Sequence, residues 1–228
     1  MKTKLVALAA VAIIACLATA SCTKDSSYYM QQRMEWVDLD LPSGLLWAAS
    51  NVGATAPEGH GDYFAWGETE IKSSYYWRTY KYSNSGGDLS KYCSRSLYGQ
   101  FHFTDTLTIL EPGDDAAVEH IGRGARTPKK EEWQELLDNT NVTWTTENGV
   151  NGLLFSATNG NSLFLPAAGL CHGETFDNEG IEGNYWSSSL ETSYPDAAWG
   201  LTFDSERQDI NSTRRYKGLP VRAVKDAR

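Results

Sequence analysis

Histidine and cysteine are the residues of this chain best suited to chemistry at neutral pH, and their spacing matches no catalytic or metal-binding motif. The four histidines are scattered, without the HExxH or CxxC spacing that holds zinc. Cys171 and His172 are neighbours, and such a pair could activate a thiolate. Adjacent residues of a strand point to opposite faces, however, which argues against a dyad. We therefore predict no catalytic residue, no metal site and no cofactor.

A disulfide between Cys93 and Cys171 is one interpretation of the two cysteines expected in the folded part. An exported protein meets an oxidising compartment, where such a bond is permitted. Closing so long a loop would stabilise the fold by ~4 kcal/mol if the geometry allowed it. Two buried, unreactive thiols are the other interpretation, because the sequence does not place the pair close together.

Residues 1–21 have the three-part layout of a secretory signal peptide. Lys2 and Lys4 precede an apolar run over 5–18, which is shorter than the ~20 residues that span a bilayer, and polar residues follow. Small residues at 19–21 lead into Cys22, and this junction resembles the lipobox of bacterial lipoproteins. The resemblance implies cleavage before Cys22 and acylation of its sulfur and its new amine. More than one acyl chain would give a stable membrane anchor.

Cys16 is the alternative lipidation site. Residues 13–16 (IIAC) fit the lipobox pattern better than 19–22 (TASC), which has Thr where Leu, Val or Ile is preferred. Cleavage before Cys16 would leave apolar residues in the tether, so the layout of the signal favours Cys22. Ordinary signal cleavage, with Cys22 left as a free thiol, is a third possibility. On the favoured prediction, residues 22–34 form a lipidated tether and residues 35–228 form one domain.

The chain is acidic, with 20 Lys and Arg against 29 Asp and Glu and a net charge of -9. An acidic surface repels phosphate backbones, so we predict no nucleic-acid partner. The same charge opposes adsorption to anionic lipid headgroups, so membrane association needs the covalent anchor. These features predict a protein of the cell envelope, lipid-anchored at the outer membrane or the cell surface.

The stretch 126–169 predicts an amphipathic helix followed by a three-stranded antiparallel meander. Thr127 is expected as the helix N-cap, with Pro128 at the first helical position. Trp133, Leu136 and Leu137 follow at i, i+3 and i+4, which gives one apolar face. Strands are expected over 142–146, 153–157 and 162–166, with Asn-Gly turns at 148–149, 151–152 and 159–160.

The rest of the domain predicts further strands and one short helix, which together give an α+β fold. The strands are expected over 36–41, 45–50, 63–66, 185–189, 198–203 and 219–224. The helix is expected over 114–120, with Asp114 and Asp115 as capping charges. Segment 170–184 is expected to be a loop. The aromatic cluster of 75–82 is expected to pack a loop onto the core rather than to stack on sugars.

Eight motifs, in order along the chain, are similar to one family. They are 37–47 (VDLDLPSGLLW), 51–54 (NVGA), 61–68 (GDYFAWGE), 114–117 (DDAA), 126–137 (RTPKKEEWQELL), 165–169 (LPAAG), 185–189 (YWSSS) and 218–224 (GLPVRAV). Together they resemble the Fibrobacter succinogenes major paralogous domain family, whose members are secreted and often lipid-anchored bacterial proteins. The resemblance runs from about residue 36 to residue 224.

This resemblance implies a C-type-lectin-like fold, shared with formylglycine-generating enzymes, of antiparallel β-sheets with two helices and long loops. It also implies that strands 36–41 and 219–224 lie side by side. The copper-binding cysteines of those enzymes are closely spaced, unlike Cys93 and Cys171. The calcium and sugar motifs of C-type lectins are missing too, so neither enzymatic activity nor lectin activity carries over.

Some relatives with this fold vary their C-terminal surface, and by analogy the loops of 182–216 are the expected ligand-binding region or, equally, a solvated face without a partner. The candidate ligand-binding residues are Asn184, Tyr194, Asp196, Arg207, Asn211, Arg214 and Tyr216. The favoured function is a non-enzymatic, lipid-anchored envelope protein that binds a glycan or a protein. The alternatives are a structural or adhesive component of a surface assembly and, third, an enzyme on the formylglycine-generating scaffold.

Overall fold

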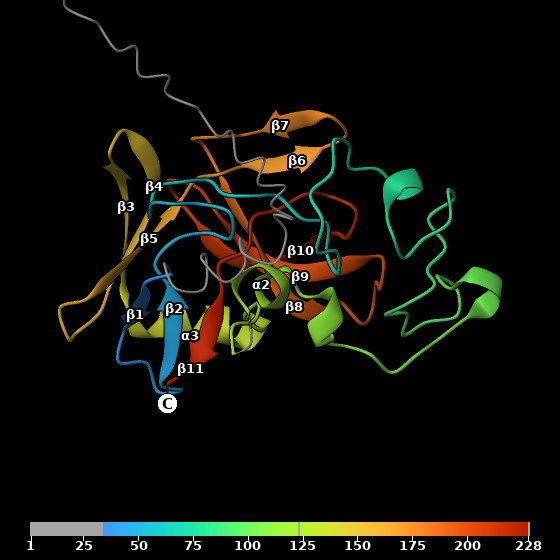
Figure 1. The fold of residues 1–228 in the computed structure, drawn as a ribbon, viewed down its shortest axis with the longest axis horizontal. Helices are drawn as coiled ribbons and strands as arrows, with labels where there is room; N and C mark the ends of the chain where they lie inside the picture. Colours follow the sequence, from blue (N-terminus) through green and yellow to red (C-terminus); the bar gives the residue numbers. More distant parts are fainter. Residues whose placement is uncertain (1–33, 123, 228) are drawn as a thin grey trace, which may run out of the picture.

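The computed structural model describes residues 34–122 and 124–227, and the predicted signal peptide, Cys16 and Cys22 lie outside these ranges. The described chain is an α+β fold of antiparallel sheets with eleven strands and two α-helices, which confirms the predicted class (Figure 1). The helices are α2 (Ala116–Ile121) and α3 (Lys130–Asn139). The strands are β1 (Trp36–Asp38), β2 (Leu45–Ala48), β3 (Asn141–Glu147), β4 (Val150–Ser156), β5 (Ser162–Pro166), β6 (Leu170–His172), β7 (Thr175–Asp177), β8 (Gly183–Leu190), β9 (Ala197–Phe203), β10 (Gln208–Arg214) and β11 (Val224–Asp226).

The amphipathic helix and the meander are confirmed as α3 followed by a sheet of order β3-β4-β5. The first turn, Asn148 and Gly149, has positive φ at both residues, as a two-residue type I′ hairpin turn requires. The expected turn at 151–152 is wrong, because both residues lie within β4. Gly152 is needed there for packing, since a Cβ would come within 2.2 Å of the Leu165 carbonyl oxygen.

The start of α3 differs from the expectation. Lys129, not Thr127, is the N-cap, and the Glu132 carboxylate accepts a hydrogen bond from the Lys129 backbone N–H at 2.7 Å. Thr127 does not cap α3 because its hydroxyl donates a hydrogen bond to the Asp115 carboxylate at 2.6 Å. The Thr127 backbone N–H donates to the same carboxylate at 2.8 Å. Asp115 also caps α2 through the Ala117 N–H at 2.9 Å, as expected.

The two ends of the domain meet in one sheet, but β2 lies between β1 and β11, so the expected side-by-side pairing of the terminal strands is wrong. Segment 219–223 is not part of a regular strand and is held by individual backbone hydrogen bonds. One of them runs from the Val52 N–H to the Val221 carbonyl oxygen at 2.9 Å. Pro220 interrupts this segment and has no N–H to donate. The expected strand over 63–66 is likewise reduced to a single bridge between Phe64 and Leu219.

A third sheet has the order β10-β9-β8 (Figure 1). Its residues are divided between the two clusters of the core. Successive residues of a strand point to opposite faces. Tyr185 therefore enters the cluster beneath α3 and the meander, whereas Trp186 enters the cluster beneath the loops of 52–93. Segment 170–184, expected to be a loop, contains the hairpin β6-β7.

The aromatic cluster of 75–82 packs onto the core, as expected. Tyr75, Tyr80 and Tyr82 are buried, and the Tyr75 hydroxyl donates to the Tyr63 carbonyl oxygen at 2.5 Å. Burial raises the pKa of Tyr75 to about 12. These rings therefore stabilise the loop rather than offer a platform to a ligand.

Candidate ligand-binding site

One face of the sheet β10-β9-β8 is covered by α3 at one end only. The register pairs Leu201 with Ile210 and Trp199 with Ser212, so these four side chains share one face. Leu201 and Ile210 belong to the cluster beneath α3, which contacts all three strands. Because α3 begins at Lys130, the remaining part of the face is left to two open hollows around Trp199 and Ser212.

The smaller hollow has a volume of about 280 Å³ and brings together Tyr194, Asp196 and Arg214, three of the seven predicted ligand-binding residues. The Tyr194 side chain is 60% exposed. Asp196 forms an ion pair with Arg214 through one carboxylate oxygen. Its other oxygen, Oδ1, is buried and has no hydrogen-bond partner among the described residues. The carboxylate therefore has unused capacity to accept a hydrogen bond.

The larger hollow, of about 440 Å³, is walled by the first residues of α3 and by the end of β8. Lys130 lies over the Trp199 ring, with Nζ 4.8 Å from the ring centroid, and within 3.9 Å of the Glu131 carboxylate. The rest of the lining is mainly hydroxyl and apolar: Thr108, Ile109, Ser189, Leu190, Glu191, Thr192 and Ser193. The sequence did not predict this hollow.

An irregularity in β8 shapes the larger hollow. Its register against β9 shifts between Trp186 and Leu190. The Ser187 hydroxyl donates to the Trp199 carbonyl oxygen at 2.8 Å, and the Ser189 hydroxyl accepts from the Lys130 backbone N–H at 3.2 Å. Bulges commonly re-aim side chains in this way. The run of three serines within an expected strand was the one sequence signal that could have indicated it.

The other four predicted ligand-binding residues lie elsewhere. The region 182–216, expected to contain loops, includes the edge strand β10, and Arg207 and Asn211 line a separate hollow of about 70 Å³. Asn184 is buried in β8 and accepts a hydrogen bond from the Thr202 hydroxyl at 3.3 Å. Tyr216 packs against Trp77, with ring centroids 4.8 Å apart. The seven residues therefore do not form a single site.

Cys93 and Cys171 are buried free thiols in the structure, which favours that interpretation over the disulfide. The Cys93 thiol donates to the Arg95 carbonyl oxygen at 3.2 Å, and Cys171 lies in β6. Burial raises the pKa of both thiols, which disfavours the reactive thiolate. His172 is exposed beside the buried Cys171, so the two side chains lie on opposite faces, as expected.

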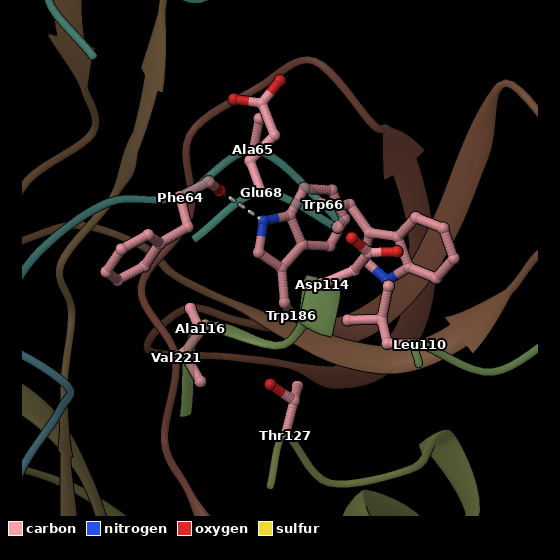
Figure 2. A pocket seen from close by; sticks show the side chains of 11 residues that line it. Phe64, Ala65, Trp66, Glu68, Leu110, Asp114, Ala116, Thr127, Trp186 and Val221 are labelled. Atoms are coloured by element: carbon pink, nitrogen blue, oxygen red, sulfur yellow. Dashed lines mark hydrogen bonds between the residues drawn. The ribbon is translucent and has the colours of Figure 1, made fainter. Parts of the chain in front are cut away.

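Figure 2 shows a small cavity in the core, lined by Trp66, Trp186 and other apolar side chains. Its volume is about 10 Å³, at the lower limit for one water molecule. The Glu68 carboxylate points away from the Trp186 ring and forms an ion pair with Lys72 at 2.8 Å. This cavity is a packing defect and has no room for a ligand.

Asp114, at the edge of that cavity, is not the helix-capping charge that the sequence predicted. It accepts hydrogen bonds from the Lys91 ammonium at 2.6 Å, from the Tyr92 hydroxyl at 2.8 Å and from the Tyr82 hydroxyl. Burial alone would raise the pKa of Asp114, but these hydrogen bonds outweigh it and lower the pKa to about 2. Asp114 therefore fastens segment 80–92 to the start of α2.

We predict that Asp114→Asn lowers the free energy of unfolding by about 2 kcal/mol at neutral pH. The folded pKa is depressed from 3.8 to about 2, so this contribution is present above pH 3.8 and is lost as the pH falls through 2. Urea denaturation at neutral pH and near pH 2 measures it. The exposed Asp88→Asn is the control, and a difference that persisted unchanged at pH 2 would contradict the assignment.

The described residues give two further negative findings. No group of three or more His, Cys, Asp or Glu side chains there could hold a metal ion. Across residues 34–122 and 124–227, no helix has the length and apolar character needed to cross a membrane.

No family model, no curated protein and no solved structure matches this chain. The geometry of the two hollows is therefore the main guide to function.

Proposed function

We propose that this chain is a lipid-anchored binding protein of the cell envelope, which holds a glycan at the hollow formed by Tyr194, Asp196 and Arg214. The observation that carries the proposal is an exposed tyrosine ring beside a paired carboxylate and guanidinium in an open hollow. Binding sites of this kind combine an apolar platform with a few polar groups that fix orientation.

The charges of the smaller hollow favour a neutral ligand. Asp196 and Arg214 neutralise each other, so neither an anion nor a cation finds an uncompensated partner there. The pair still offers guanidinium donors, and the hydroxyls of Ser212 and Thr213 both donate and accept. Sugar hydroxyls match such a mixture, and the Tyr194 ring offers an apolar surface to the C–H face of a sugar.

Binding without turnover is supported by the state of the nucleophiles. The Cys171 thiol is buried and its pKa is raised, and His172 faces away from it. A thiolate mechanism needs the opposite arrangement, with an exposed thiol of lowered pKa next to a base. One oxygen of the Asp196 carboxylate is already engaged in the ion pair with Arg214.

The anchor and the finer fold belong to the same proposal. The signal layout of residues 1–21 and the position of Cys22 support acylation at Cys22, with Cys16 as the alternative. A C-type-lectin-like arrangement is supported by terminal segments that share one sheet, by two helices and by the large share of loops (Figure 1). Membership of the major paralogous domain family is proposed on the sequence motifs alone.

Glycan arrays followed by calorimetry with the best array ligand test this proposal. Tyr194→Ala is expected to weaken binding at least tenfold, about 1.4 kcal/mol, with the thermal unfolding midpoint unchanged. Phe176→Ala is the matched control, because Phe176 is also an exposed aromatic residue (54%) but lies on β7, outside both hollows. Equal binding by Tyr194→Ala and the unsubstituted protein would contradict the proposed site.

The anchor is tested separately by labelling cells with a fatty-acid analogue. Label that is lost on Cys22→Ser and kept on Cys16→Ser is expected, and an unlabelled Cys22 would contradict the anchor. A protein that bound no array glycan but co-purified with a stoichiometric envelope partner would instead support a component of a surface assembly.

A further inference from the structure

We propose that the larger hollow is a second subsite continuous with the first, so that the site takes a linear, neutral oligosaccharide lying across β9 and β10. This inference rests on the proposed function and deepens it. Tyr194 contacts one sugar unit and Trp199 contacts another farther along the chain. A ligand that fills both hollows is bound more tightly than a single sugar.

The two hollows share one floor. Trp199 lines the larger hollow and Ser212 lines the smaller, and the register places these residues directly opposite each other on the same face. Side chains in such a pair have Cβ atoms ~5 Å apart. Ala197 and Arg214, the next pair along that face, both line the smaller hollow. A linear molecule can therefore cross from one hollow to the other without leaving the sheet.

The volumes of the two hollows are close to those of known ligand clefts. Ligand clefts usually have volumes of ~300–1,000 Å³. The smaller hollow falls just short of this range and the larger lies within it, at about 280 and 440 Å³. Loop residues on the rim change from Thr192 and Ser193 at the larger hollow to Tyr194 at the smaller. The loop is thus shared by both hollows.

The chemistry of the larger hollow selects the ligand class. The charged residues that line it are Lys130, Glu131 and Glu191. The net charge of the lining is therefore negative, which disfavours the binding of phosphate or an acidic sugar. Lys130 is engaged by the Trp199 ring and by Glu131, and the Glu191 carboxylate accepts a hydrogen bond from the Ser193 N–H at 2.7 Å. The hydroxyls of Thr108, Thr192 and Ser193 remain for a ligand rich in hydroxyls.

The walls of the larger hollow are fixed by the fold before any ligand arrives. The Lys130 backbone N–H donates a hydrogen bond to the Ser189 hydroxyl, and the Leu190 N–H donates to the Thr108 carbonyl oxygen at 2.8 Å. The aromatic floor, Trp199, lies in the middle of β9. Sites on strands and helices lose little conformational freedom on binding, which favours affinity.

The test is calorimetry with neutral glucose, mannose and xylose oligomers, from monosaccharide to hexasaccharide, on the full domain. The unsubstituted protein is expected to bind the longer oligomers at least tenfold more tightly than the monosaccharide. Trp199→Ala should remove this dependence on length while leaving the affinity for the monosaccharide unchanged. Trp36→Ala is the matched control, because Lys225 lies over the Trp36 ring at 4.4 Å in a similar pair outside the hollows.

A second variant covers the case in which Trp199→Ala fails to fold. Thr192→Arg places a long side chain on the exposed rim of the larger hollow and should remove the same dependence on length. If both variants keep it, the second subsite is wrong. If Tyr194→Ala weakens every oligomer while the Trp199 and Thr192 variants change nothing, the proposed function stands without this extension. Binding of a peptide or protein in place of every oligomer would overturn both.

Discussion

Replacing Arg215 by methionine is expected to lower the free energy of unfolding by about 3–5 kcal/mol. Arg215 is fully buried at the end of β10. Its guanidinium donates to the carbonyl oxygens of Tyr92 at 3.0 Å, Pro195 at 2.9 Å and Lys91 at 3.1 Å, and to the Tyr80 hydroxyl at 2.8 Å. Methionine fills similar space but leaves three carbonyl groups without a donor. Each such loss costs ~1–3 kcal/mol, partly offset because a charge is no longer buried.

Urea denaturation followed by circular dichroism measures this loss, and Arg207→Met is the control. The Arg207 side chain is 73% exposed, so its replacement is expected to change the free energy of unfolding by less than about 0.5 kcal/mol. Arg215→Lys should fall between the two, because one ammonium cannot reproduce the planar fork of donors. An Arg215→Met protein as stable as the unsubstituted chain would show that the buried charge contributes nothing net.

The same substitution connects stability to the binding site. Pro195 lies between Tyr194 and Asp196, so its bond to Arg215 fixes the loop between the two hollows. Amide hydrogens of segment 191–196 are therefore expected to exchange faster in Arg215→Met, under conditions in which the rest of the domain stays folded.

Local patterns predicted the elements that are stabilised by their own neighbours in sequence. The periodicity of Trp133 and Leu136 predicted α3, and both side chains are buried. Asn148 and Gly149 predicted the first hairpin of the meander, and β5 has the expected bounds. In each case the signal lies within a few residues of the structure that it specifies.

The segments that the sequence misplaced are held by distant partners. The aromatic run 63–66 looked like a strand, yet its rings serve packing and only Phe64 makes a bridge, to Leu219. The start of α3 was misplaced because Asp115, twelve residues away, takes the hydrogen bonds of Thr127. No local propensity contains that information, because it depends on how α2 is placed against α3.

The candidate site was predicted in part for the same reason. Tyr194, Asp196 and Arg214 were found because polar and aromatic residues in a C-terminal region suit ligand contact. Trp199 was missed because its role depends on two facts outside β9. These are the pairing with Ser212 and the position at which α3 begins, which together leave this part of the sheet uncovered.

Replacing Trp186 by alanine is also expected to lower the free energy of unfolding by about 3–5 kcal/mol. Trp186 is 1% exposed, and its indole N–H donates to the Phe64 carbonyl oxygen at 2.7 Å (Figure 2). The neighbouring Trp66 is fixed by its own hydrogen bond to the Ser187 carbonyl oxygen, at 2.8 Å. The surroundings therefore cannot collapse into the space, and the existing cavity of about 10 Å³ would grow.

Two further variants divide this loss between volume and hydrogen bonding. Trp186→Phe keeps most of the ring but removes one of the two hydrogen bonds to the Phe64 carbonyl oxygen, which still accepts from the Leu219 N–H at 3.0 Å, so it should cost only ~0.5–1.5 kcal/mol. Trp144→Ala, at a partly buried position on β3, should cost less than Trp186→Ala. Equal midpoints and slopes in urea for Trp186→Ala and the unsubstituted chain would mean that β8 does not join the two core clusters. Because Trp199 and the larger hollow depend on β8 through Ser187 and Ser189, such a result would also remove the physical basis for a preformed second subsite.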